Sequence, residues 1–200
     1  MDQGFIMFSI HFSCYWGMVF KYDNESSYTS YLDATTNSLK NQLLYTLPGS
    51  LLFFTCYPVK YDHLMLSFLA ILPLILLSDV YFFLTHRMLH TRLLWKYHKA
   101  HHTNQVHVAK ALDANLAEHV IGNLGSFAVP FFILRHFGVT VHIYVLYLWV
   151  AISTINTCIS HSSKRILGDK GVHEIHHRSL KYNFGTGFYI LDRLFGTYKE

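Results

Sequence analysis

The chain contains 200 residues, of which 52% are hydrophobic, 16% aromatic and only 14% charged. So few charges cannot cover the surface of an ordinary soluble domain, and the composition therefore predicts a membrane protein. The length suits one compact unit, since no internal repeat, low-complexity tract or linker divides the chain. The net charge of +4 reflects basic residues beside histidine motifs, which favours a cytoplasmic membrane face and argues against a nucleic-acid partner.

The first apolar segments, in chain order, differ in how well they match a membrane span. Residues 5–20 form an aromatic run that is short for a span, and residues 43–57 form a marginal one. Residues 64–84 form a clean span, within which Pro73 is expected to kink the helix without ending it. The second and third segments predict a helical hairpin whose turn is residues 58–63.

A second hairpin is predicted further along the chain. An apolar region starts near Val120, is interrupted at residues 135–138 and resumes over residues 139–159. This interruption predicts a helical hairpin that turns at Gly138.

The two hairpins fix the side of the membrane on which the histidine motifs lie. These motifs follow the second arm of each hairpin, so they share one face, which the neighbouring lysines and arginines make cytoplasmic. Residues 1–42 are predicted as an N-terminal segment, either an extra span or an interfacial helix, and residues 43–200 as the membrane domain. The predicted fold is all-α: an integral membrane bundle of two transmembrane hairpins with a cytosolic, histidine-rich helical cap.

Nine of the 15 histidines fall into four short motifs. Residues three or four apart on a helix share a face, so a motif with that spacing directs two or three imidazoles to one place. Without a metal, such packing would crowd groups that titrate near pH ~6.5 and repel one another when protonated. The motifs, which therefore predict a metal site, are His86-x-x-x-His90, His98-x-x-His101-His102, the lone His161 and His173-x-x-His176-His177.

The number of histidines favours two ions. Nine ligands exceed the four of a structural zinc site and the three of a catalytic one. Imidazole suits zinc, copper, iron and nickel alike, so the spacing alone does not name the element. Soluble carboxylate-bridged di-iron proteins repeat a Glu-x-x-His motif, and here only Glu174-x-x-His177 has that form. An all-histidine pair of ions is the prediction.

Asp79 lies seven residues before His86, which is about two turns back on the same helix face. An unpaired carboxylate near the membrane boundary is costly. We therefore expect Asp79 to orient a ligand histidine or to bind a partner of one. The alternative is a helix-end charge that reaches the interface.

The motifs together with their neighbours carry a family resemblance. The segments that carry it are Asp79-Val-Tyr-Phe-Phe-Leu-Thr-His86-Arg87-Met-Leu-His90, Trp95-Lys-Tyr-His98-Lys99-Ala-His101-His102, His173-Glu-Ile-His176-His177, Asn183-Phe-Gly185 and Asp192-Arg193-Leu-Phe-Gly196-Thr-Tyr198. Over residues 64–200 the chain resembles the fatty acid hydroxylase/sterol desaturase superfamily of integral membrane di-iron oxygenases. The lone His161, with Thr157 four residues before it, is similar to the sterol branches.

This resemblance implies a set of ligands and a membrane. The implied metal ligands are His86, His90, His98, His101, His102, His161, His173, His176 and His177. His119 is implied either as a further ligand or as a residue behind the ligands. The resemblance also implies that residues 43–200 form a di-iron oxygenase domain in an endoplasmic-reticulum-type membrane, with its active site on the cytosolic face. Outside the motifs, we expect His107 at the surface and a local ion pair between Asp192 and Arg193.

The implied activity is O₂-dependent oxidation of a membrane lipid at two iron ions, for which zinc can substitute in purified protein. A sterol is the favoured substrate, and a fatty acyl or sphingolipid chain is the alternative. Electrons must come from a partner such as cytochrome b5 or an NAD(P)H reductase, because no G-x-G-x-x-G nucleotide fingerprint is present. Two other classes stay open: a membrane zinc hydrolase, and a non-catalytic lipid- or metal-binding relative.

Overall fold

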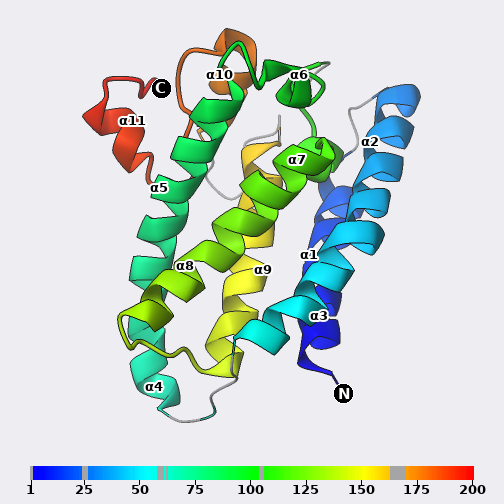
Figure 1. The fold of residues 1–200 in the computed structure, drawn as a ribbon. Coiled ribbons are helices and arrows are strands. Elements are labelled where there is room, and N and C mark those ends of the chain that lie inside the picture. The colour runs from blue at the N-terminus through cyan, green and yellow to red at the C-terminus, as the bar shows by residue number, and fades with distance from the viewer. Residues whose placement is uncertain (1, 24–26, 58–60, 62, 104–105, 163–169) are drawn as a thin grey trace.

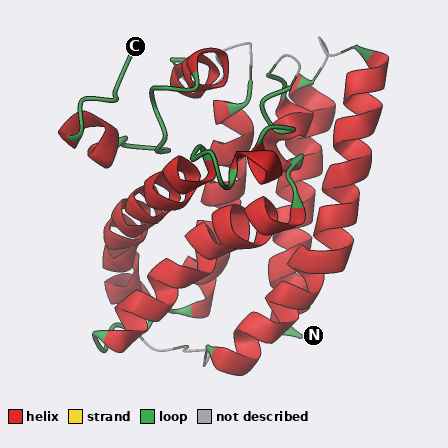
Figure 2. Ribbon diagram, turned by 45° about the horizontal axis from the view of Figure 1, so that its top comes forward, coloured by secondary structure: helices red, strands yellow, loops and turns green. Residues whose placement is uncertain are grey.

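A computed structural model describes residues 2–23, 27–57, 61, 63–103, 106–162 and 170–200. This part of the chain consists of helices joined by loops, and the predicted all-α class is confirmed (Figures 1 and 2). The long helices lie side by side in one bundle, and the short helices α6 and α10 cap one end of it (Figure 1). The α-helices are α1 Gln3–Tyr22, α2 Tyr28–Asn41, α3 Leu47–Cys56, α4 Leu64–Ser67, α5 Ile71–Leu89, α6 Trp95–His98, α7 Leu116–Glu118, α8 Gly125–His136, α9 Ile143–Ser160, α10 Val172–Ser179 and α11 Ile190–Leu194.

Short segments of other helical geometry join several of these helices end to end. The π-helical segments η1 (Gln42–Thr46) and η4 (His119–Leu124) connect α2 to α3 and α7 to α8. The 3₁₀ segment η2 (Phe68–Ala70) connects α4 to α5, and a separate 3₁₀ turn, η3, spans Val108–Leu112. Since π-turns within α-helices are rare and often accompany functional sites, η1 and η4 are of particular interest.

Both predicted hairpins are present as helix pairs. The second turns at Gly138, whose φ of +78° is the left-handed conformation that glycine adopts without strain. There the Gly138 N–H donates to the Arg135 carbonyl and the Val139 N–H donates to the Leu134 carbonyl, each at 2.9 Å. In the first hairpin, residues 58–60 and 62 of the expected turn lie outside the described residues. The short helices α6 and α10, which carry histidine motifs, lie at the opposite end of the bundle from α4 and from the turn between α8 and α9 (Figure 1).

Three helical stretches of the described chain are long and apolar enough to cross a membrane: Leu64–Leu89, Leu116–His136 and Ile143–Ser160. The first of them continues past the predicted end at Leu84 and carries His86 on the same helix. Their exposed side chains include Leu69, Leu72 and Leu148, as a lipid-facing surface requires. The segments over residues 5–20 and 43–57 are helical but fall outside this set.

Prolines within the helices have local compensation. Pro73 lies directly after η2, so the backbone tightens to a 3₁₀ turn there and the helix continues, as expected. Pro130 has no N–H to donate to the Ser126 carbonyl four residues earlier. That carbonyl instead accepts a hydrogen bond of 2.8 Å from the Ser78 hydroxyl, which also ties α5 to α8.

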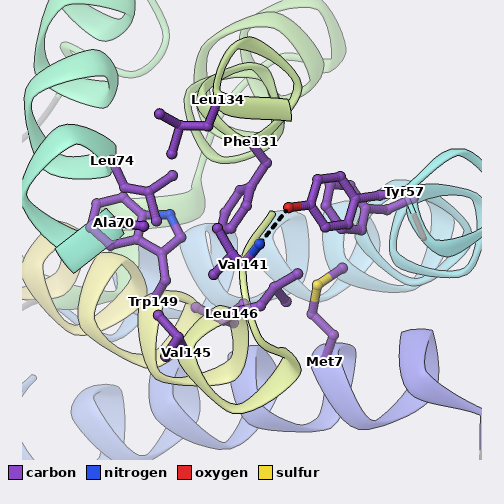
Figure 3. Packing of buried hydrophobic residues seen from close by; sticks show 12 residues of the cluster. Met7, Tyr57, Ala70, Leu74, Phe131, Leu134, Val141, Val145, Leu146 and Trp149 are labelled. Carbon is purple, nitrogen blue, oxygen red and sulfur yellow. Dashed lines mark hydrogen bonds between the residues drawn. The ribbon is translucent and has the colours of Figure 1, made fainter. Parts of the chain in front are cut away.

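The larger core cluster brings together side chains from α1, α3, α5, α8 and α9 (Figure 3). Leu74, Phe131 and Trp149 from three different helices meet there, each with at most 4% of its surface exposed. The Tyr57 hydroxyl accepts a hydrogen bond of 3.3 Å from the Val141 N–H, so a polar atom in this apolar cluster is satisfied (Figure 3). The cluster joins the helices of the two hairpins to each other.

The N-terminal helix α1 packs against α3 and α9. A second core cluster joins it to α2, η3 and α9, with Tyr15 and Val19 fully buried. The Tyr15 hydroxyl donates to the Ala109 carbonyl at 2.7 Å, and the Trp16 indole N–H donates to the Gln42 side chain at 2.9 Å. Residues 3–22 are therefore integrated into the same bundle as the rest of the chain.

His107 is buried, which corrects the expected surface position. Its Nδ1 lies 2.8 Å from an Asp23 carboxylate oxygen, and its Nε2 lies 3.0 Å from the Ser30 hydroxyl. The same Asp23 oxygen accepts a hydrogen bond from the Ala109 N–H at 2.6 Å. This hydrogen-bonded chain links the end of α1, the start of α2 and η3, which explains why a polar ring is buried at that position.

The close approach of α1 to α3 gives a stability prediction. A Cβ atom added at Gly4 would lie 2.6 Å from the Ser50 carbonyl oxygen and 2.7 Å from the Leu51 Cα, and backbone atoms cannot move aside cheaply. We expect Gly4→Ala to destabilise the protein by about 1–3 kcal/mol. At Gly17, on the same helix, a Cβ would meet nothing within 4 Å. Gly17→Ala should stabilise the helix by about 0.5–1 kcal/mol, so opposite shifts of the Tm in detergent are the expected result.

Candidate metal centre

The four histidine motifs meet at the capped end of the bundle. His86 lies in the last turn of α5, and His90 is the residue at which that helix ends. His98 ends the short helix α6, and His161 ends α9. The C-terminal motif occupies α10, whose eight residues carry three of the histidines. Helix ends that are far apart in sequence thus bring the motifs together.

The nine histidines form two compact groups, in which the ligand atoms lie within 4.8 Å of one another. Both groups are composed of histidine only. The first group is His86, His90, His98, His102 and His176, and the second group is His101, His161, His173 and His177. The two groups adjoin each other, because the His102 and His177 rings, one from each group, have centroids only 4.4 Å apart.

Each H-x-x-H-H motif contributes to both groups, in a crossed pattern. In the motif after α6, His98 and His102 join the first group and His101 joins the second. In α10 the assignment is reversed, because His173 and His177 join the second group and His176 joins the first. The pair four residues apart faces one group while the intervening histidine faces the other. The motif spacing thus serves two adjacent sites at once.

Within each group the Nε2 atoms point toward one another. His98 Nε2 lies 3.0 Å from His86 Nε2 and 2.8 Å from His102 Nε2. In the second group, His161 Nε2 lies 3.1 Å from His101 Nε2, and the Nε2 atoms of His173 and His177 are 3.2 Å apart. Such short separations between nitrogens suit a shared positive ion between them.

Backbone carbonyls hold several rings in the orientation that leaves Nε2 free. The Nδ1 atoms of His86 and His176 lie 2.8 Å and 2.7 Å from the carbonyl oxygens of Phe184 and Tyr182. His161 Nδ1 lies 2.9 Å from the carbonyl of the residue one turn earlier in α9. A ring that donates its Nδ1–H to a carbonyl presents a lone pair on Nε2, which is the form that binds a metal.

Glu118 is a site residue that the sequence analysis did not single out. Its Oε1 atom lies 2.9 Å from His98 Nδ1 and 3.8 Å from His101 Nδ1, and its side chain is buried. One carboxylate therefore contacts a histidine of each group. The sequence feature that could have identified Glu118 is its position at the start of an apolar span, where an unpaired charged side chain would be costly.

His119, the neighbour of Glu118, lies outside both groups. Its Nε2 is 2.9 Å from the Thr46 hydroxyl, and its Nδ1 is 3.4 Å from the Asn123 amide. These contacts connect the two π-helical segments, since Thr46 ends η1 and His119 begins η4. The structure thus places His119 outside both histidine groups, with Thr46 and Asn123 as its partners.

Asp79 contacts the C-terminal loop and no histidine ring. Its Oδ1 accepts hydrogen bonds from the Thr186 and Tyr189 N–H groups at 3.0 and 3.2 Å, and its Oδ2 accepts one from the Ile190 N–H at 2.7 Å. This loop includes Phe184, whose carbonyl meets His86. Asp79 therefore holds the loop that carries the Phe184 carbonyl, and its expected role in orienting a ligand histidine stays a prediction.

Asp192 holds the same loop from the other side, in place of the expected ion pair with Arg193. Its carboxylate accepts hydrogen bonds from the Phe184 N–H at 2.9 Å, the Gly185 N–H at 2.6 Å and the Thr197 hydroxyl at 2.7 Å. The carboxylate is fully buried. These three hydrogen bonds satisfy the carboxylate without a cation, and they fix the segment that carries the Phe184 carbonyl.

The donor set fits a pair of metal ions. The Nε2 atoms of His90 and His176 are buried and have no hydrogen-bond partner among the described residues. An unpaired buried nitrogen costs about 1–3 kcal/mol, which a bound metal would offset. Imidazole is a good ligand for iron and for zinc, so the residues fit either element.

Burial also lowers the histidine pKa values, which gives a prediction about pH. Together with neighbouring imidazoles, burial lowers the pKa of His98 from 6.5 to about 2, and burial is the main cause that lowers the pKa of His161 to about 4 and of His176 to about 3. These histidines bind protons more tightly in the unfolded chain than in the folded protein. Their contribution to the free energy of unfolding is therefore fully present above about pH 6.5, and it is lost as the pH falls toward their pKa values in the folded protein.

We expect acid to release metal and unfold the protein together. Below about pH 6.5, each such histidine costs about 1.4 kcal/mol per pH unit. The measurement is the Tm and the metal content of purified protein in detergent between pH 8 and about pH 5. An unchanged Tm and full metal retention at the acid end would contradict the buried neutral state of these rings.

A cavity of about 420 Å³ opens beside the histidine groups. His86, His98 and His161 line one end of it, and apolar side chains such as Phe53 and Phe127 line the rest. The volume lies within the range of about 300–1,000 Å³ that is usual for small-molecule sites. An elongated apolar ligand could therefore reach the predicted metal centre from inside the bundle.

Comparison with known proteins agrees with this arrangement. The family model described as fatty acid hydroxylase matches residues 69–197, which is most of the chain and includes all nine histidines. The chain belongs to the fatty acid hydroxylase family, and the family predicted from the motifs is confirmed. No solved structure is significantly similar to the chain.

Individual relatives include sterol and fatty-acid enzymes. A candidate methylsterol monooxygenase of Dictyostelium discoideum is 29% identical over 134 residues, which cover 61% of this chain and 47% of the relative. Lathosterol oxidase of Rattus norvegicus is 28% identical over 72% of this chain and 48% of its own length. Fatty acid hydroxylase ahd1 of Mycosarcoma maydis is 34% identical over 62% of this chain and 32% of its own. The chain thus spans about half the length of the first two relatives.

Proposed function

We propose that the protein is an O₂-dependent di-iron oxidoreductase that hydroxylates or desaturates a membrane lipid, with a sterol as the favoured substrate. The observation that carries this proposal is the pair of all-histidine groups at the end of an apolar cavity. Membership of the fatty acid hydroxylase family and the names of the relatives support it. The lone histidine that ends α9 supports the sterol branch within the family.

In this proposal the nine histidines hold the two ions, and the ions supply O₂ activation for the oxidation of a C–H bond. The chain's own contribution is to orient the ligands and the lipid and to exclude water. The Phe184 and Tyr182 carbonyls and the Glu118 carboxylate fix ring orientation, because each contacts the Nδ1 atom of a histidine. The apolar wall of the cavity positions the lipid carbon beside the histidine end.

The remaining parts of the proposal concern place and partners. Three helices suited to crossing a membrane support a multi-pass protein, which we place in an endoplasmic-reticulum-type membrane. Exposed Arg87, Lys96 and Lys99 lie beside the histidine motifs, so the positive-inside rule assigns that end to the cytosol. These charges would also suit an acidic electron donor such as cytochrome b5 or an NAD(P)H reductase.

A fatty acyl or sphingolipid chain is the second candidate substrate, favoured by the 34% identity to fatty acid hydroxylase ahd1. A membrane zinc hydrolase would need no reductant, and a non-catalytic relative would show no turnover. The identity of the bound metal distinguishes a zinc hydrolase from the oxygenase. Product formation distinguishes the oxygenase from a non-catalytic relative.

The test is a sterol and fatty-acid profile of yeast that expresses the full chain, compared with cells that express His176→Ala at matched protein level. New oxidised or unsaturated lipids that disappear in the variant would establish the oxygenase and name its substrate class. An unchanged profile, with inserted protein and a co-expressed reductase, would contradict the proposal.

A further inference from the structure

The cavity wall contains two polar side-chain atoms, outside the metal centre, that no described residue satisfies. His11 and Trp149 both line the cavity, and both lie outside the two histidine groups. Within the described part of the chain, His11 Nε2 and Trp149 Nε1 are buried and make no hydrogen bond. An unpaired buried donor or acceptor costs about 1–3 kcal/mol, so each atom requires an explanation.

The His11 ring is held in place by a side chain of α9. Its Nδ1 lies 2.9 Å from the Thr154 hydroxyl, which is buried and also lines the cavity. With Nδ1 engaged, Nε2 is the ring atom left for a ligand. Three serines of the wall are already engaged, because Ser78, Ser126 and Ser153 each donate to a backbone carbonyl.

The helix geometry of α9 gives the depth of this pair. Thr154 precedes His161 by seven residues, so the two lie on one face about 10 Å apart along the helix axis. Both residues line the same cavity. A ligand atom beside His11 would therefore lie about two helical turns from the histidine groups. Trp149 is a further five residues away along the same helix.

We propose that His11, oriented by Thr154, binds one hydroxyl or carbonyl oxygen of an otherwise apolar lipid. This inference deepens the proposed function, because it names a feature of the substrate: an oxygen about 10 Å from the carbon that faces the histidines. The neutral imidazole can donate to or accept from that oxygen, depending on its tautomer. In this arrangement the oxygen of the lipid lies beside His11 and the reacting carbon lies beside the histidine groups.

The same chemistry could come from a sterol or from an acyl chain, and binding experiments distinguish the two. The probes are a 3-hydroxysterol with its 3-deoxy counterpart, and a long-chain fatty alcohol with the alkane of equal length. Each Kd is obtained for the purified full chain with its bound metal in nanodiscs, under argon and without reductant so that no turnover occurs, from the rise in Tm with ligand concentration. We expect one of the two alcohols to bind about tenfold more tightly than its deoxy partner, as one hydrogen bond allows.

Variants assign that preference to His11. In His11→Phe the alcohol should lose its advantage, whereas the deoxy lipid should bind within about twofold of wild type. His11→Gln keeps a hydrogen-bonding group and should retain part of the preference. Thr154→Val should reduce the preference, because the ring loses its orienting partner. His136→Phe, an exposed histidine at the end of α8, is the matched control and should behave as wild type.

Several results would overturn the inference. The first is a wild-type protein that prefers neither alcohol over its deoxy partner. The second is an alcohol preference that survives in His11→Phe. The third is an alcohol preference that Trp149→Phe abolishes and His11→Phe retains. Because the measurement needs no turnover, its failure leaves the oxygenase proposal standing. A failed lipid profile in yeast would likewise leave this binding result intact.

Discussion

Replacing His98 with alanine is expected to lower lipid oxidation by more than a hundredfold. His98 is central to the first group, since its Nε2 lies within 3.0 Å of the Nε2 atoms of both His86 and His102. Loss of a residue that only supports a ligand typically costs about 10–100-fold in metal affinity or activity, and loss of a ligand should exceed that range. The alanine variant also leaves the Glu118 carboxylate without its partner at 2.9 Å.

The measurement is product formation together with metal titration of the purified variant. His136→Ala serves as the control, because this exposed histidine lies at the opposite end of the bundle, beside the hairpin turn. We expect wild-type metal affinity and product yield from the control. Near-normal metal affinity and turnover in His98→Ala would contradict a role of His98 as a metal ligand.

Asp192→Ala is expected to weaken the protein and its metal centre together. The carboxylate accepts three hydrogen bonds, two of them from the backbone N–H groups of Phe184 and Gly185. Two buried N–H groups without a partner would cost about 2–6 kcal/mol. The Phe184 carbonyl would lose its fixed position against His86 Nδ1, and we expect metal affinity to fall by about 10–100-fold.

Titration of the metal-free protein with iron or cobalt, alongside the Tm, measures both effects. Asp192→Asn keeps an acceptor and should show the smaller loss. Asp33→Ala removes an exposed carboxylate from α2 and is the control for charge alone. If Asp192→Ala lowered the Tm but left metal affinity at the wild-type level, the C-terminal loop would be a structural element without influence on the histidines.

Much of the candidate site could be predicted because it is encoded in local spacing. All nine histidines named from the motifs are brought together, since residues four apart share a helix face and helix ends converge at one end of the bundle. The shared side of the motifs followed from the hairpins, and the position of the turn at Gly138 followed from the interruption of the apolar run.

The supporting contacts could not be predicted, because they join residues that are distant in the sequence. Asp79 meets backbone groups more than 100 positions away, and the Phe184 carbonyl meets a ring 98 positions earlier. A backbone carbonyl also has no signature in a side-chain pattern. The sequence did not show that Glu118, and not its neighbour His119, contacts the histidine groups. Which of the two side chains faces them depends on the start of the π-helical segment η4, because a π-turn changes the direction in which the following side chains point.

The buried position of His107 was missed for the same reason. Its partners, Asp23 and Ser30, lie more than 70 residues away, at the junction of α1 and α2. The place of residues 3–22 within the bundle likewise depends on tertiary packing against α9, whereas their sequence alone allowed a span or an interfacial helix.

The central claim is that two all-histidine groups hold two iron ions. The most direct measurement is the metal content of the full chain, purified from cells grown with ample iron and little zinc, by elemental analysis and Mössbauer spectroscopy. We predict two iron ions per chain. Zinc retained under those conditions, or a folded, membrane-inserted chain that binds no iron, would contradict the account.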